Sequence, residues 1–369
     1  MALDRSTIDK IPVWVWAAPV AAVLLILATM VNVIPASAMI ALLLAAVLLG
    51  AAVFASVHHA EIIALRVGEP FGSIVLAIAV TVIEVALIVS IMLTAKSGSE
   101  TLARDTVFAT VMLVLNGIIG FCLLLGGARH HEQKFRTNAA AAALSVLGTL
   151  AVFTLVLPNY TLAAYGPVFS TSQLIFVATA SMVLYGVFLF VQTIRHRDYF
   201  LLEVEGPEGA QEPAVVPSAR TAWISGALLA LSLTAVVLLA KILSPVLERV
   251  VYAAGLPKAV VGVVIAAVVL LPEGISALHA ARLNRLQTSL NLALGSAMAT
   301  IGLSIPIVGI AALWLGQPLT LGLAPGEMVL LILTLFISTL TLAEGRTTIL
   351  QGAVHLSIFA VFLFLAAVP

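Results

Sequence analysis

The sequence predicts an all-α polytopic membrane protein with about eleven transmembrane helices. Of its 369 residues, 62% are hydrophobic and only 9% are charged, and the mean hydropathy is +1.20. A soluble domain of this composition would expose large apolar patches. A bilayer core of about 30 Å needs about 20 apolar residues per helix. Such runs predict spans at 12–34, 35–57, 70–94, 106–126, 137–157, 168–194, 221–242, 258–280, 287–312, 326–343 and 347–368.

Charge and cysteine content narrow the possible partners. The formal net charge is zero, so no electrostatic argument favours binding to nucleic acid. The single cysteine, Cys122, lies in an apolar run, which excludes an intramolecular disulfide. The expected surroundings of the chain are therefore the lipid bilayer, with inorganic cations and protons as small partners. No cofactor is expected.

The first apolar run, 12–34, is predicted to be a retained extra helix that forms an N-terminal domain over 1–34. It exceeds the apolar region of a signal peptide, which spans about 7–15 residues. A cleaved signal peptide is the less favoured alternative.

A hydrophilic break separates two halves of the chain. The segment 195–220, RHRDYFLLEVEGPEGAQEPAVVPSAR, is rich in Glu, Pro and Gly, as is typical of a surface linker. A solvated acidic linker is the favoured interpretation. A cation-sensing role is the alternative for the cluster Glu203, Glu205, Glu208 and Glu212.

Lys and Arg predict the orientation, because they concentrate in cytoplasmic loops. With the N-terminus inside, twelve of them fall in cytoplasmic segments and five in outside segments. The N-terminus and the acidic linker are therefore expected in the cytoplasm and the C-terminus outside. The short N-terminus and the minimal linker suit a bacterial inner (plasma) membrane.

Eleven spans with one linker divide as one plus five plus five. Because five is odd, the second set of five enters the membrane from the opposite side, which predicts two inverted five-helix repeats at 35–194 and 221–369. Inverted repeats are typical of secondary transporters.

Sequence similarity between the halves supports this pairing. The stretches GEPFGSIVLAIAVTVIEVALIV (68–89) and GLPKAVVGVVIAAVVLLPEGISAL (255–278) each begin with Gly-x-Pro and carry one Glu deep in the span. Twelve residues separate Gly72 from Glu84, and eleven separate Gly262 from Glu273. A Gly-rich helix follows each of them.

Glu84 and Glu273 are the strongest candidates for function. The other Asp and Glu fall in predicted loops, in the termini or within a few residues of a span end. A charged side chain at the centre of a bilayer costs about 2.5–3.5 kcal/mol on insertion scales. Because two costly glutamates lie at matching positions of the two predicted repeats, they indicate a functional site. The structural alternative is a protonated Glu that hydrogen-bonds across a helix interface.

Two carboxylates that face one another near the membrane midplane repel, so at least one tends to hold a proton. A cation between them removes the repulsion but requires them deprotonated, so protons and the cation compete for the site. Ca²⁺ takes about 6–8 oxygen ligands, and Na⁺ needs fewer. Asn116, Ser296, Thr300, water and backbone carbonyls are candidates for the remaining ligands. Pro272 removes a helical hydrogen bond directly before Glu273.

The glycines Gly117, Gly120, Gly295 and Gly302 either let helices pack closely or expose carbonyls to an ion, and close packing is the favoured role. His279 and Glu69 are candidates for a proton relay or for the cytoplasmic mouth. His355 is expected to be a hydrogen-bonded structural group, with a relay as the alternative. The pairs His58–His59 and His130–His131 resemble metal-ligand clusters, but both fall at predicted span ends, where interfacial placement is favoured.

The segments 66–93 and 271–306 resemble parts of the two alpha-repeats of the cation/Ca²⁺ exchanger superfamily. By this resemblance the complete alpha-repeats span about 66–127 and 255–306. The resemblance is greatest to the bacterial calcium/sodium–proton antiporters of the Ca²⁺/H⁺ exchanger branch. It implies that Glu84 and Glu273 hold the transported cation, supported by Asn116–Gly117, Gly295–Ser296 and Thr300. Many members have Gly-Asn before each Glu, whereas this chain has TVIE and LLPE. Fewer side-chain oxygens make Na⁺ or K⁺ a candidate beside Ca²⁺.

The function predicted from the sequence is therefore exchange of cytoplasmic Ca²⁺, and also Na⁺ or K⁺, for external protons by alternating access. The ions are substrates, and no enzyme activity is expected. Two alternatives stay open: a Glu-lined cation channel without proton coupling, and an intramembrane metalloenzyme that uses the histidine pairs.

Overall fold

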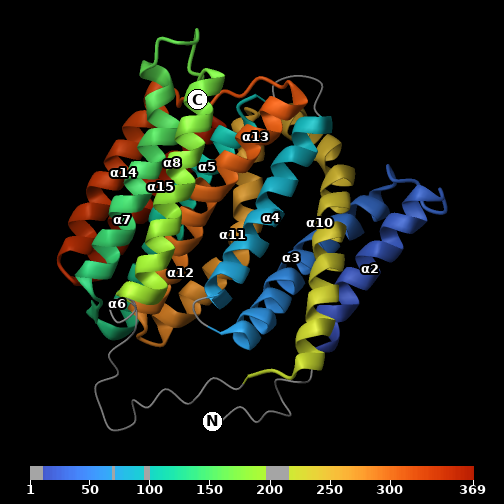
Figure 1. Cartoon of the computed structure of the whole chain (residues 1–369), viewed down its shortest axis with the longest axis horizontal. Coiled ribbons are helices and arrows are strands. Elements are labelled where there is room, and N and C mark those ends of the chain that lie inside the picture. Colours follow the sequence, from blue (N-terminus) through green and yellow to red (C-terminus); the bar gives the residue numbers. More distant parts are fainter. Residues whose placement is uncertain (1–10, 69–70, 95–99, 197–215) are drawn as a thin grey trace. The chain divides into compact units, whose positions relative to one another are not determined.

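The computed structural model describes residues 11–68, 71–94, 100–196 and 216–369. Within these ranges, eleven helical segments are long and apolar enough to cross a membrane, which confirms the all-α polytopic fold. The single-element spans are α2 (Val13–Met30), α3 (Met39–Val67), α4 (Phe71–Thr94), α10 (Ala219–Ala253), α11 (Ala259–Arg282), α14 (Pro325–Ala343) and α15 (Ile349–Ala367). Four further spans are composite and contain a segment of π-helix (Figure 1).

The composite spans differ in where the π-helical segment lies. In two of them it is internal: α5 (Leu102–Met112), η1 (Leu113–Ile118) and α6 (Ile119–His130), then α12 (Leu286–Ala299), η5 (Thr300–Ser304) and α13 (Ile305–Leu315). In the other two it lies toward the C-terminal end: α7 (Thr137–Ala151), η2 (Val152–Val156) and the 3₁₀ turn η3 (Leu157–Tyr160), then α8 (Thr171–Phe190) and η4 (Val191–Arg195). Single-turn π-helical segments are rare in proteins, and those that occur are often found at functional sites.

The chain forms two compact units. The first contains α2, α3, α4 and α10 up to Arg249, and the second contains the remaining helices. This division follows helix packing rather than the predicted five-helix repeats, and those repeats stay a prediction.

The core of the first unit brings α2, α3 and α10 together. Small and branched apolar residues meet there: Ala22, Leu25 and Ile26 of α2, Ala45 of α3, and Ala235 and Leu239 of α10. Alanines on all three helices allow the close approach that membrane helices need in the absence of a hydrophobic driving force. The extra N-terminal helix is thus an integral part of this unit (Figure 1).

A proline explains a specific contact between α2 and α3. Pro19 lies inside α2 and has no N–H, so the carbonyl of Val15 lacks its usual partner four residues later. The Nε2 atom of His59 lies 3.3 Å from that carbonyl oxygen. His59 is completely buried, and its ring donates the hydrogen bond that Pro19 cannot.

The prediction that the His58–His59 pair lies at a span end was wrong. Helix α3 continues ten residues past the expected end at 57 and stops at Val67, before Gly68 at φ +76°. The apolar residues after the pair, such as Ile62, continue the helix. The hydrogen bond between His59 and the Val15 carbonyl offsets the free-energy cost of burying the polar imidazole ring. Glu61, expected in a loop, also lies within α3.

The start of α4 requires a glycine. A Cβ on Gly72 would lie 2.6 Å from the carbonyl oxygen of Ala64 in α3, closer than real contacts allow. Gly72 therefore lets α4 begin directly against α3. The predicted pairing of Gly72 with Gly262 has a structural counterpart, because Gly262 also lies against a neighbouring backbone, in α5.

Helix α10 is likewise longer than expected. Its predicted end at 242 lies just before Ser244 and Pro245, but the helix continues through both residues to Ala253. The hydroxyl of Ser244 donates to the carbonyl of Ala240 at 2.7 Å, which satisfies this polar group within the helix.

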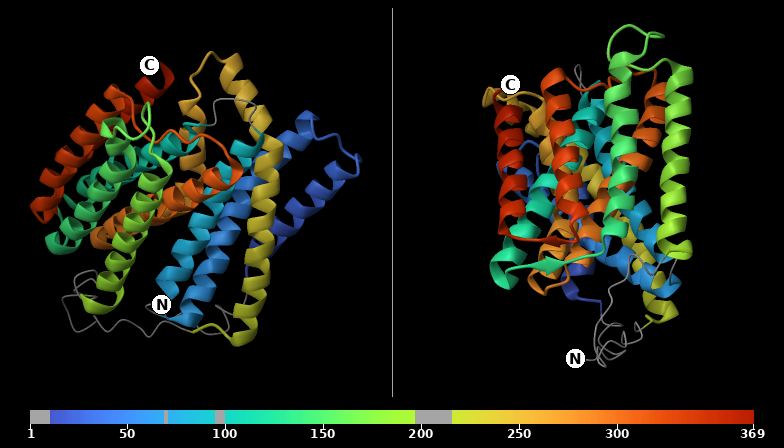
Figure 2. Two further views of the ribbon diagram at one scale, coloured as in Figure 1. Left: turned by 45° about the horizontal axis from the view of Figure 1, so that its top comes forward. Right: turned by 90° about the vertical axis from the view of Figure 1, so that its left-hand side faces the viewer.

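In the second unit, two short strands close one end of the bundle. Strands β1 (Gln133–Lys134) and β2 (Arg346–Thr347) pair antiparallel, with Gln133 opposite Thr347 (Figure 2). The Gln133 side chain also donates to the carbonyl of Ala281 at 2.9 Å and to Asn284 at 3.0 Å. The C-terminal end of α11 is therefore tied to the segment that follows α6.

Candidate cation site and its surroundings

Glu84 lies near the middle of α4, in the first unit, and only 1% of its surface is exposed. Its neighbours on the helix, Ile83, Leu87 and Ile88, are also buried. A carboxylate among such side chains carries a large desolvation cost unless it is protonated or binds a cation. The Glu84 side chain therefore lies in the protein interior, near the middle of a helix that is long enough to cross a membrane.

Glu273 lies in α11, in the second unit, and is half-buried. Pro272 stands directly before it inside the helix, so the carbonyl of Val268 has no N–H four residues later. A carbonyl released in this way is an oxygen donor of the kind that Ca²⁺ and Na⁺ accept.

Two glycines hold α11 against the fourth span. A Cβ on Gly262 would lie 2.9 Å from the backbone of Asp105 and Thr106 in α5. A Cβ on Gly274 would lie 3.3 Å from the Ile118 side chain in η1. Ile118 of the π-helical segment therefore lies against the residue that directly follows Glu273.

The helix that follows Glu273 carries three of the expected supporting residues. Helix α12 packs against α11, and the Ser289 hydroxyl donates to the carbonyl of Ala277 at 2.7 Å. Gly295 and Ser296 are half-buried, and the Ser296 Oγ atom is buried with no hydrogen-bond partner among the described residues. Thr300 is buried and opens the π-helical segment η5.

The glycines predicted to pack closely divide into two groups. Added Cβ atoms at Gly117, Gly120 and Gly302 would lie 3.3 Å or less from side chains of α15 or α8, so these glycines allow close helix packing. At Gly295, a Cβ would meet no described atom within 4 Å. Gly295 is therefore the member of the set that close packing does not explain.

Asn116 lies within η1 and is completely buried, where it joins a polar cluster with α14 and α15. Its Nδ2 donates to the Thr334 hydroxyl at 2.9 Å, and its Oδ1 lies 3.1 Å from Nδ1 of His355. The other ring nitrogen of His355 lies 3.1 Å from the Thr341 hydroxyl. The amide of Asn116 is therefore engaged by the last two helices.

His355 is only 1% exposed, and both of its ring nitrogens have partners. The expectation that it is a hydrogen-bonded group in the last helix is confirmed. Its partner Thr341 and the Asn116 partner Thr334 were not predicted. Thr334, Ser338 and Thr341 recur at intervals of four and three residues, which places three buried polar groups on one face of α14. That stripe is the sequence signal for this cluster.

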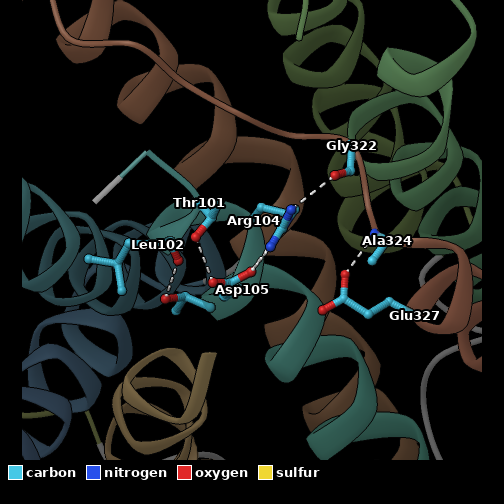
Figure 3. A network of polar contacts seen from close by, with 8 residues as sticks. Thr101, Leu102, Arg104, Asp105, Gly322, Ala324 and Glu327 are labelled. Carbon is cyan, nitrogen blue, oxygen red and sulfur yellow. Dashed lines mark hydrogen bonds and ion pairs between the residues drawn. The ribbon is translucent and has the colours of Figure 1, made fainter. Parts of the chain in front are cut away.

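A second polar network lies near the start of α5 (Figure 3). Asp105 is 5% exposed and accepts hydrogen bonds from Thr101 at 2.9 Å and from two nitrogens of Arg104 at 2.8 and 2.7 Å. Arg104 also donates to the carbonyl of Gly322 at 3.2 Å, while Glu327 accepts from the N–H of Ala324 at 2.9 Å. The network joins α5 to the segment before α14.

The remaining candidates are placed as follows. His279 is exposed near the end of α11, and His130 lies 3.0 Å from the carbonyl of Arg282 through its Nε2 atom. His131 follows α6 with φ +65°. Glu69 and the acidic cluster Glu203, Glu205, Glu208 and Glu212 lie outside the described residues.

Comparison with known proteins places the chain in a family. Residues 37–194 and 224–368 match the family described as sodium/calcium exchanger protein. The chain belongs to this exchanger family. The two matched ranges leave out residues 1–36 and 195–223.

Three curated relatives each cover most of the length of this chain. It is 56% identical to y4hA of Sinorhizobium fredii, which has a provisional name as an ionic transporter, over 97% of both chains. It is 37% identical to the sodium-potassium/proton antiporter ChaA of Escherichia coli, over 84% of both chains. A Ca²⁺/H⁺ antiporter of Aphanothece halophytica is 27% identical, over 74% of this chain and 77% of that one.

Two solved structures share the fold. The structure of native YfkE superposes with a TM-score of 0.72 and 16% identity, over 96% of this chain and all of that one. The H⁺/Ca²⁺ exchanger CAX superposes with a TM-score of 0.65 and 15% identity, over 94% and 87%. These two structures confirm the fold. The resemblance to the cation/Ca²⁺ exchanger superfamily is confirmed by the family match together with the antiporter relatives.

Proposed function

We propose that the protein is a cation–proton antiporter in which Glu84 and Glu273 form the transport site. The observation that carries the proposal is that each carboxylate lies well inside a helix of membrane-spanning length, and in the sequence a Gly-x-Pro motif precedes each of these two helices. Relatives named as antiporters of sodium, potassium, calcium and protons support the reaction class.

The coupling follows from the chemistry of the carboxylates. Deprotonated, the pair offers the charge and oxygen ligands that attract a cation. Protonated, it offers neither, so a bound proton and a bound cation exclude one another. If the site opens to one side of the membrane at a time, each ligand crosses only in exchange for the other. External protons would release the cation outside, and proton loss to the cytoplasm would restore the site.

The supporting ligands determine which cation is carried. The oxygen donors proposed to support Glu273 are the Ser296 hydroxyl of α12, Thr300 of η5 and the Val268 carbonyl of α11. This is a modest set for Ca²⁺, which takes about 6–8 oxygens. We therefore propose that Na⁺ and K⁺ are substrates together with Ca²⁺. The organisation proposed for the membrane has the N-terminus and the acidic linker in the cytoplasm and the C-terminus outside.

Everted membrane vesicles with a preformed pH gradient test this function. A pH-sensitive dye follows the gradient, and a permeant anion collapses the electrical potential, so cation entry through a channel cannot drive proton movement. Ca²⁺, Na⁺ and K⁺ are added separately, with choline as the inert cation. The wild type should dissipate the gradient with at least one of the three cations.

The matched variants are Glu84→Gln and Glu273→Gln, with Glu344→Gln, at an exposed position, as the control. Both site variants should abolish cation-dependent dissipation, and the control should retain it. Activity that survives in either site variant would overturn the proposed site. A wild type that responds to no cation would overturn the antiporter function.

A further inference from the structure

We propose that His355 is a positioning residue for cation transport, acting through Asn116 and the π-helical segment η1 on the surroundings of Glu273. This inference rests on the proposed function. It assigns a role in transport to α15, a helix that carries neither of the two deep glutamates.

The first step is the direction of the hydrogen bonds around His355. The Nδ2 atom of Asn116 donates to Thr334, so its Oδ1 is the atom that faces His355 at 3.1 Å. An amide oxygen only accepts, and therefore Nδ1 of His355 carries the hydrogen. Nε2 then accepts from the Thr341 hydroxyl at 3.1 Å. The neutral ring satisfies every one of these contacts.

The second step is the close packing that aims His355 at η1. The buried residues of α15, Gly352, His355, Ile358 and Phe362, recur at three or four positions and form one face. A Cβ on Gly120 would lie 3.1 Å from the Cβ of His355, and one on Gly117 would lie 3.3 Å from the Phe359 ring. Glycines on the fourth span thus bring α15 near enough for the imidazole to reach Asn116.

The third step leads from Asn116 to the transport site. Asn116 and Ile118 belong to the same π-helical segment, Leu113–Ile118. Ile118 packs against Gly274, the residue after Glu273. A π-helical turn is less stable than α-helix and persists where its surroundings hold it. The bond from His355 fixes one side of this segment, and the contact with Gly274 transmits its position to the helix that carries Glu273.

Two substitutions separate positioning from simple loss of a side chain. The amide nitrogen of Asn corresponds in reach to Nδ1 of histidine, and that of Gln corresponds to Nε2. His355→Asn therefore keeps a donor toward Asn116, whereas His355→Gln moves the donor toward Thr341. Neither amide titrates, so a group that carries protons is lost in both variants.

The assay measures cation-dependent dissipation in everted vesicles over a range of cation concentrations and pH. His355→Gln should raise the cation concentration for half-maximal exchange by about three- to tenfold, the change expected for one lost buried hydrogen bond. His355→Asn should stay within about twofold of the wild type. The pH profile should keep its wild-type shape in both variants. Thermal unfolding of the purified variants in detergent reports folding separately.

Four outcomes overturn the proposal: wild-type behaviour of His355→Gln, equal loss in both variants, a shifted pH profile in both, or a lower unfolding temperature in His355→Gln with unchanged half-maximal concentration. The shifted profile would assign His355 to proton transfer instead. Failure of the proposed antiporter function is recognised separately. In that case the wild type would show no cation–proton exchange, or its exchange would persist in Glu273→Gln.

Discussion

The contact between α11 and α5 gives a quantitative test of how Glu273 is held. In Gly262→Ala, the new Cβ would lie 2.9 Å from the backbone of both Asp105 and Thr106. Ordinary contacts begin at 3.4 Å, so the two helices must separate by about 0.5 Å at this point, and backbone atoms cannot rotate away. Overpacking of this kind costs about 1–3 kcal/mol. The unfolding midpoint of the detergent-purified protein should fall by about 2–10 °C.

Gly186→Ala is the matched control, because its Cβ would meet no described atom within 4 Å. Alanine has the higher helix propensity, so this variant should be as stable as the wild type or slightly more stable. Gly262→Ala should also lower exchange activity per folded molecule, since α11 carries Glu273. If Gly262→Ala unfolds at the same temperature as Gly186→Ala, the packing argument for α11 is refuted.

Three further predictions concern other parts of the molecule. Gly295→Ala should fold normally, because a Cβ has room there, yet lower the apparent cation affinity in the vesicle assay; unchanged affinity would remove Gly295 from the site. His59→Leu leaves the Val15 carbonyl without its donor at a cost of about 1–3 kcal/mol, whereas His59→Gln keeps an amide nitrogen near the position of Nε2. Thermal unfolding should rank Gln above Leu, and equal values would contradict the role of this bond. Arg104→Met should lower the unfolding midpoint by leaving the Asp105 carboxylate buried without its cation, and adding Asp105→Asn should restore part of the loss. A double variant no more stable than Arg104→Met would count against the ion pair.

The sequence predicted the fold class well because the bilayer imposes a simple rule of length and hydrophobicity. Errors arose where polar side chains find partners inside the membrane. The span of α3 was ended at 57 because two histidines follow, although the carbonyl released by Pro19 accepts a hydrogen bond from His59. The predicted span of α10 likewise ended too early, at 242, before Ser244 and Pro245.

The candidate site was predicted in part. The cost of a buried charge and the matching positions in the two halves singled out Glu84 and Glu273. Close packing was predicted for four glycines, and the structure shows it at Gly117, Gly120 and Gly302 but not at Gly295. The partners of Asn116 could not be predicted, because they lie 218 and 239 residues later in the chain. The only sequence signal for that cluster is the spacing of Thr334, Ser338 and Thr341 in α14. This spacing does not indicate which helix the three side chains face. The π-helical turns η1 and η5 also have no simple sequence pattern.

The central claim is that a cation and protons compete for the same two carboxylates. Purified protein in weakly buffered detergent solution, with a pH-sensitive dye, measures this directly as protons released when Ca²⁺, Na⁺ or K⁺ binds. We expect release in the wild type and in Glu344→Gln, and none in Glu84→Gln or Glu273→Gln. Cation binding without proton release in the wild type, or undiminished release in either site variant, would contradict the claim.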